Sequence, residues 1–160
     1  MAEHTATITW ARASGENFMD KRYHRAHIWQ FDGGATVAAS SSPHVVPLPY
    51  SDAAAVDPEE AYVAALSSCH MLWFLDLASR AGLRVNCYTD AAVGTMAQDE
   101  QGRLVVTQVQ LRPVTRFDAA HAPSAEQLQD LHHRAHAACF LANSVKTRVD
   151  CMPVLEVGGA

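Results

Sequence analysis

Residues 57–82 read DPEEAYVAALSSCHMLWFLDLASRAG and predict one long, apolar helix. Asp57 suits the N-cap position and Pro58 suits the first turn, where a missing N–H costs nothing. Gly82 is a typical residue for ending a helix, because it adopts the left-handed conformation without strain. Polar residues are few between positions 66 and 77. We therefore expect this helix to be buried on most of its sides.

Strand patterns precede this helix. Three short segments before position 41 alternate or are rich in β-formers, and a Gly-Gly turn signal ends the second of them; they span residues 4–12, 23–34 and 35–40. The next segment, SSPHVVPLPYSDAAAV at 41–56, contains three prolines and cannot be helical. We expect it to form a long loop, and loops of this length are often functional.

A second group of strands and a second helix follow. The helix opens at Ser124, and Gln127 completes a capping box. Strand patterns lie on both sides of it, at 83–96, 104–117 and 147–157. The resulting order, βββ-α-ββ-α-β, predicts an α+β fold in a single domain over residues 1–160.

Composition narrows the function classes. The chain has 160 residues, 49% hydrophobic content and a formal net charge of −5. The negative charge argues against nucleic acid as a partner. We find no apolar run of membrane-spanning length and no leader pattern in MAEHTATITW. We therefore expect a cytoplasmic protein with no membrane partner.

Two cysteines, Cys69 and Cys139, each lie in a helix-like apolar segment, 70 residues apart. Two thiols that meet can form a reversible disulfide, and the pair therefore suggests a thiol-dependent redox cycle. The alternative is that they are two unrelated buried thiols, since free Cys is often buried. Cys87 and Cys151 lie in strand patterns and are expected to fill the core.

The segment DPEEAYVAALSSCHM, followed by AHAACFLANS, resembles the OsmC/Ohr family of osmotically inducible and organic hydroperoxide resistance proteins. The resemblance implies two long central helices flanked by antiparallel sheets in an intertwined homodimer. It also implies reduction of organic hydroperoxides to alcohols as part of a stress response. It assigns Cys69 as the peroxidatic thiol, Cys139 as the resolving thiol and Glu59 as the glutamate of the site.

The chemistry requires a cation near the reactive thiol. A free thiol has a pKa of about 8.5 and is mostly protonated at neutral pH, so a nearby positive charge must favour the thiolate. Arg is the natural supplier, and a carboxylate can hold it through a bidentate pair. The family places this Arg in the N-terminal strands or the following loop. Here the loop contains no Arg, so Arg22 and Arg25 are equal candidates for the cation, and Arg12 is a less favoured one. His44 and Tyr50 of the loop are the residues that could line the site instead of an Arg.

Glu59 and Cys69 are ten residues apart on the predicted helix, a rise of roughly 15 Å. They cannot share a site within one straight helix. Two antiparallel copies of the helix across a two-fold axis would bring Glu59 of one chain to Cys69 of the other. If Glu59 belongs to the site, the protein is an obligate homodimer.

Other functions remain open. The alternative is a non-catalytic protein of the same fold that binds an apolar ligand or senses oxidants through the thiol pair. His132, His136 and Cys139 could form a metal-binding helix face, but without a fourth ligand a polar helix face is preferred and no metal or cofactor is expected. For a peroxidase, the partners would be an organic hydroperoxide and a lipoyl or thioredoxin-like dithiol.

Overall fold

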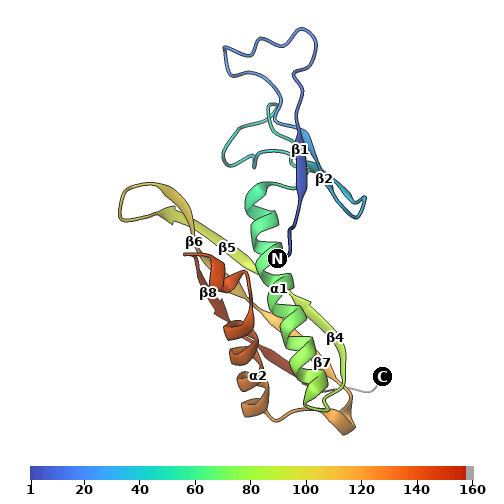
Figure 1. Ribbon diagram of the computed structural model, residues 1–160. Coiled ribbons are helices and arrows are strands. Elements are labelled where there is room, and N and C mark those ends of the chain that lie inside the picture. The colour runs from blue at the N-terminus through green and yellow to red at the C-terminus, as the bar shows by residue number, and fades with distance from the viewer. Residues whose placement is uncertain (158–160) are drawn as a thin grey trace. The chain divides into compact units, whose positions relative to one another are not determined.

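The long helix α1 spans Pro58–Arg80 in the computed structural model, which describes residues 1–157 (Figure 1). Its start is a capping box. The backbone N–H of Glu60 donates to Asp57 Oδ1 at 2.7 Å, and the Asp57 N–H donates back to Glu60 Oε2 at 3.2 Å. Its end is followed by Gly82, which has a φ of 73°. The predicted boundaries are therefore confirmed, and the caps explain them.

Burial of α1 differs from the prediction. Only a single stripe at four-residue spacing is buried within the chain, formed by Leu66, His70, Phe74 and Ala78. The expectation that most sides would be buried is wrong for one chain, because Leu72 on another side is 61% exposed. By length and composition alone, α1 could also cross a membrane. This finding corrects the expectation that no segment is long and apolar enough to span one. We assign α1 to the core, because its buried stripe packs against other described elements.

The chain divides into two units, Met1–Ala61 and Tyr62–Ala160, and each is described separately. The N-terminal unit contains a three-stranded antiparallel sheet in the order β1-β2-β3; its strands are β1 (Ala6–Thr9), β2 (His27–Phe31) and β3 (Thr36–Ala39). The proline-rich segment forms turns and no helix, as predicted. Its end pairs with the sheet through a single bridge between Val56 and Ala39.

The C-terminal unit contains more strands than the sequence suggested. Each of the three predicted strand segments is divided in two; the resulting strands are β4 (Val85–Asp90), β5 (Val93–Gln98), β6 (Leu104–Leu111), β7 (Pro113–Phe117), β8 (Arg148–Cys151) and β9 (Val154–Val157). They form two sheets in the orders β4-β7-β9 and β5-β6-β8. The β6–β8 and β7–β9 pairs are parallel, which corrects the expectation of purely antiparallel sheets.

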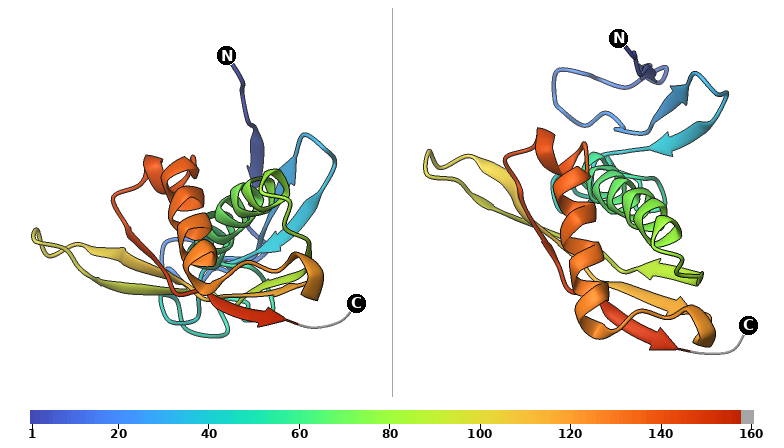
Figure 2. Two further views of the ribbon diagram at one scale, coloured as in Figure 1. Left: turned by 90° about the horizontal axis from the view of Figure 1, so that it is seen from below. Right: turned by 60° about the horizontal axis from the view of Figure 1, so that its bottom comes forward.

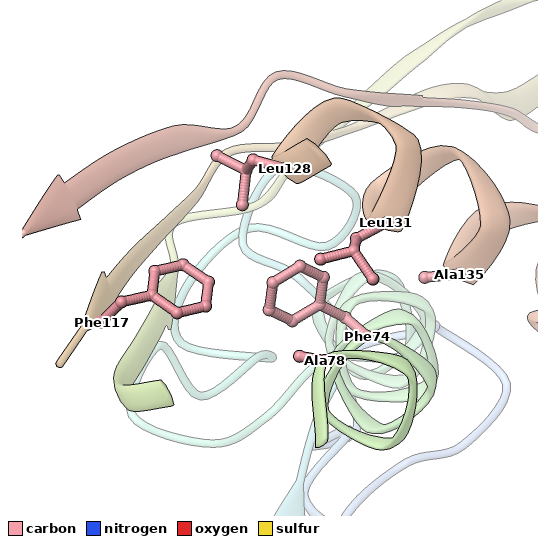
Figure 3. Packing of buried hydrophobic residues seen from close by; sticks show 6 residues of the cluster. All are labelled: Phe74, Ala78, Phe117, Leu128, Leu131 and Ala135. Atoms are coloured by element: carbon pink, nitrogen blue, oxygen red, sulfur yellow. The ribbon is translucent and has the colours of Figure 1, made fainter. Parts of the chain in front are cut away.

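Helix α2 (Ala125–Ala138) lies beside the later turns of α1 (Figure 2). It begins with the predicted capping box of Ser124 and Gln127, and it has 14 residues, so only α1 is long. Short 3-10 helices flank it at Ala119–His121 and Ala142–Ser144. Figure 3 shows the core between the helices and the sheet, where Phe74 of α1 faces Phe117 and Leu131.

A second core cluster holds the earlier turns of α1 against the other sheet. Leu66 packs with Val109 and Leu111 of β6. The Tyr62 hydroxyl donates to Thr147 Oγ1 at 2.7 Å, and that hydroxyl donates to the Val106 carbonyl at 2.8 Å. The C-terminal unit therefore fixes α1 from Tyr62 onward. The prediction of a single domain over residues 1–160 stays a prediction.

Candidate functional site

Cys69 and Cys139 meet in the C-terminal unit. Cys69 lies in the middle of α1 and is half-buried, whereas Cys139 is the C-cap of α2 and only 1% exposed. Burial raises the pKa of the Cys139 thiol, and a hydrogen bond with the Cys69 side chain raises it further. Two thiols separated by 70 residues in sequence are therefore in contact, and both are free.

The Cys139 thiol holds its proton at neutral pH. A thiol with a raised pKa keeps its proton to higher pH than an ordinary thiol does. The backbone N–H of Ala142 also points to Cys139 Sγ at 3.5 Å and fixes that sulfur at the helix end. The end of α2 therefore holds a protonated thiol beside Cys69.

Exposed apolar side chains lie next to both cysteines in the sequence. Leu72, one turn after Cys69 on α1, is 61% exposed, and Phe140, directly after Cys139, is 69% exposed. Phe140 packs edge-on against Trp73 with 5.3 Å between ring centroids. Large exposed apolar side chains in a group indicate a binding surface.

Glu59 and Arg25 line one open cleft in the N-terminal unit, with a volume of about 500 Å³. Its walls are mainly apolar and aromatic, and include Trp10, Phe18 and Tyr23. The guanidinium carbon of Arg25 lies 3.8 Å from the centroid of the Tyr23 ring. Its Nη1 donates to the carbonyls of Lys21, at 2.9 Å, and Tyr23. In the described part of the chain, backbone carbonyls and an aromatic ring hold Arg25, not the carboxylate that the sequence argument expected.

The other predicted cations lie outside this cleft. Arg22 is exposed, and its backbone N–H donates a hydrogen bond to Asp20 Oδ1 at 2.8 Å. Arg12 donates to the carbonyl of Glu16 at 2.5 Å. Neither these residues nor His44 and Tyr50 are among those that line the cleft. Of the two arginines that the sequence left equal, Arg25 alone shares a cleft with Glu59.

A second group of polar side chains was missed by the sequence reasoning. His70 on α1, His132 on α2 and Cys151 on β8 converge, with their ligand atoms within 4.8 Å of one another. Both histidines are buried, so the expectation that His132 lies on a polar helix face is wrong. The expectation that Cys87 fills the core is also wrong, because Cys87 is exposed. The four-residue spacing of Leu66, His70 and Phe74 was the available signal, because it puts His70 on the buried stripe.

Burial changes the proton affinities in this group. It lowers the pKa of His70 to about 4 and that of His132 to about 3, with the neighbouring imidazoles adding repulsion. Burial and, to a lesser degree, the Asp90 carboxylate together raise the pKa of Cys151 to about 12. At neutral pH the group consists of two neutral imidazoles and a protonated thiol.

Comparison with known proteins identifies the fold. A family model described as OsmC-like protein matches residues 51–152. An OsmC-like protein of unknown function from Vibrio cholerae is 51% identical, with a TM-score of 0.94 over 96% of this chain and 100% of that one. No curated protein sequence matches the chain.

Two more distant structures share the fold alone. An organic hydroperoxide resistance protein from Elizabethkingia anophelis is 16% identical, with a TM-score of 0.68 over 99% of this chain and 98% of that one. An organic hydroperoxide resistance protein OsmC from Legionella pneumophila is 13% identical, with a TM-score of 0.63 over 98% and 100%.

Proposed function

This chain belongs to the OsmC-like protein family, and we propose that it is a thiol-dependent peroxidase that reduces organic hydroperoxides to alcohols. One observation carries the proposal: the Cys69 and Cys139 side chains are in contact although the sequence separates them by 70 residues. Relatives that share the fold include proteins named for organic hydroperoxide resistance, which supports the substrate class.

The proposed cycle begins at Cys69. Its thiolate attacks the O–H oxygen of the hydroperoxide, and the O–O bond breaks, which leaves Cys69 as a sulfenic acid. The alkoxide takes up a proton from solvent and leaves as the alcohol. The sulfur of Cys139 then attacks the sulfenic sulfur, and water leaves as the disulfide forms. An external dithiol, lipoyl or thioredoxin-like, reduces the disulfide by two exchange steps and is itself oxidised.

We further propose that the working unit is a homodimer. Leu72 is 61% exposed, and Ser68 and Ala65, one and two turns earlier, are also exposed. One side of α1 therefore has no partner among the described residues of a single chain. A second copy of this helix, antiparallel across a two-fold axis, would cover that side. It would also bring Glu59 and Arg25 of one protomer toward Cys69 of the other.

In this proposal Arg25 supplies the positive charge that favours the Cys69 thiolate. Two features favour it over Arg22: it is half-buried, and it lines the same cleft as Glu59. An Arg remains charged even when partly buried, because its pKa exceeds 12. Glu59 would orient the guanidinium once the second protomer is in place. The aromatic walls of the cleft favour an apolar peroxide over hydrogen peroxide.

The same cleft also favours the alternative, a protein that binds an apolar ligand without turnover. Its volume of about 500 Å³ is within the range of small-molecule sites. Peroxide turnover separates the two possibilities, because a binder consumes no dithiol.

The test is the reduction of cumene hydroperoxide in the presence of a reduced lipoyl dithiol, followed by stopped-flow and steady-state kinetics. We expect turnover by the unaltered protein and none by Cys69→Ser. Cys139→Ser should form one sulfenic acid per chain and then stall, because no second thiol can resolve it. Mass spectrometry identifies the sulfenic acid after trapping with a dimedone-type reagent.

Cys87→Ser is the matched control, because Cys87 is an exposed thiol on β4 and outside the proposed cycle. It should retain full turnover. Normal cycling by Cys139→Ser would remove the resolving role. Absence of turnover by the unaltered protein at millimolar peroxide would favour the apolar-ligand binder.

A further inference from the structure

We propose that His70, His132 and Cys151 form a zinc site, distinct from the Cys69–Cys139 pair. Three secondary-structure elements, α1, α2 and β8, each contribute one ligand. The proposal does not depend on peroxidase activity and uses none of the residues assigned to it.

The distances fit a tetrahedral ion. His70 Nε2 and His132 Nδ1 are 3.0 Å apart, and Cys151 Sγ is 3.7 Å from the first and 3.6 Å from the second. With zinc–nitrogen bonds of about 2.05 Å and a zinc–sulfur bond of about 2.3 Å, tetrahedral angles require separations of about 3.3 Å and about 3.6 Å. Only the two nitrogens must move apart, by about 0.3 Å.

The chemical state of the ligands also fits. A histidine ligand must be unprotonated, and burial keeps both imidazoles neutral by lowering the pKa of His70 to about 4 and of His132 to about 3. The Cys151 thiol is protonated without a metal. Zinc would displace that proton, so binding releases one proton per ion as the zinc–sulfur bond forms.

The surroundings favour a cation. The Asp90 carboxylate acts on both His70 and Cys151, so a negative charge already faces two of the three ligands.

The site also has an entrance and room for a fourth ligand. His132 and Cys151 line an open cleft of about 430 Å³, together with His133, His136 and Asp150. Three protein ligands beside such a cleft match the pattern of zinc sites that keep one position for water or a substrate. The sequence argument had joined His132 to His136 and Cys139; the structure joins it to His70 and Cys151 instead.

Cobalt substitution tests the site directly. Tag-free, reduced protein is stripped with a chelator and titrated with Co²⁺, then with Zn²⁺. We expect about one cobalt per chain, a thiolate-to-cobalt charge-transfer band, the intense visible bands of tetrahedral cobalt, and their loss when zinc is added. A weak spectrum of the octahedral type from the unaltered protein would overturn the proposal without any variant.

Variants identify the ligands. Cys151→Ser and His70→Gln should weaken zinc binding by more than about 100-fold, beyond the range for loss of a merely supporting partner. Cys87→Ser and His4→Gln, at exposed positions outside this cleft, should leave it unchanged. The double variant Cys69→Ser, Cys139→Ser should keep the cobalt spectrum. If Cys151→Ser keeps the charge-transfer band, or the double variant loses it, the ion is bound elsewhere and the proposal fails.

Discussion

Cys139 has two properties that a resolving thiol needs, and both arise from its position at the end of α2. It is 1% exposed, and its raised pKa keeps it protonated while Cys69 reacts. Contact with Cys69 places it beside the sulfur at which a sulfenic acid would form. A buried, protonated second thiol is protected from direct oxidation, because thiolate character and exposure determine susceptibility.

The protonation of Cys139 predicts its reactivity toward iodoacetamide. In the folded, reduced protein at pH 7, the exposed Cys87 should be alkylated well before Cys139, because only the thiolate reacts. A raised pKa lowers the thiolate fraction at any given pH. The Cys139 rate should therefore still be rising above about pH 10, where an ordinary thiol with a pKa of about 8.5 is almost fully ionised. Peptide mass spectrometry over a pH series measures the separate rates.

The Cys69→Ser variant is the control for this prediction. Burial is the larger cause of the raised pKa of Cys139 and the Cys69 contact the smaller one. Slow alkylation of Cys139 should therefore persist in the variant. Equal rates for Cys87 and Cys139 in the unaltered protein would contradict the assignment.

At the scale of elements, the packing of α1 on β5 depends on a glycine. A Cβ added at Gly94 would lie 2.6 Å from Cγ2 of Val63 on α1. Valine is stiff about χ1 and cannot easily turn away. The strand and the helix approach each other closely at this point because Gly94 has no side chain to meet Val63.

Gly94→Ala should lower the free energy of unfolding by about 1–3 kcal/mol, the usual cost of overpacking. Urea denaturation measures the loss. Gly33→Ala is the control, because an added Cβ there meets nothing within 4 Å and its φ is not positive. The double variant Val63→Ala, Gly94→Ala should lose less stability than the sum of the two single variants. Equal stability of Gly94→Ala and Gly33→Ala would contradict the close approach.

The ends of the two helices were predictable from the sequence, whereas the division and pairing of the later strands were not. The bounds of α1 and α2 were predictable because the capping boxes at Asp57 and Ser124 are local and satisfy backbone groups near the helix ends. The division of the later strands was not predicted, although Pro113 and Pro153 lie at two of the breaks and cannot donate to a ladder. The parallel pairing of β8 with β6 joins distant segments, and no local pattern specifies it.

For the whole molecule, the proposed homodimer makes a prediction that a monomer cannot satisfy. If Glu59 of one protomer serves Cys69 of the other, Glu59→Gln and Cys69→Ser should each be inactive alone. A mixed dimer would contain one complete site out of two. With random pairing, co-refolded variants should recover about a quarter of the turnover of the unaltered protein.

Light scattering on the same samples gives the oligomeric state and so separates loss of assembly from loss of chemistry. Each single variant refolded alone is the control and should stay inactive. A mixture that forms dimers but shows no more turnover than the separate variants would place Glu59 and Cys69 in different sites.

The sequence by itself determined the helices, the loop between the N-terminal strands and α1, the α+β class and the family. Each of these depends on neighbours within a few turns of chain or on a motif in one continuous segment. The tertiary structure alone decided that Cys69 contacts Cys139, that Arg25 and not Arg22 shares a cleft with Glu59, and that His70, His132 and Cys151 converge. These groupings join residues far apart in the chain, and the packing of helices on sheets, which is a long-range property, sets their distances.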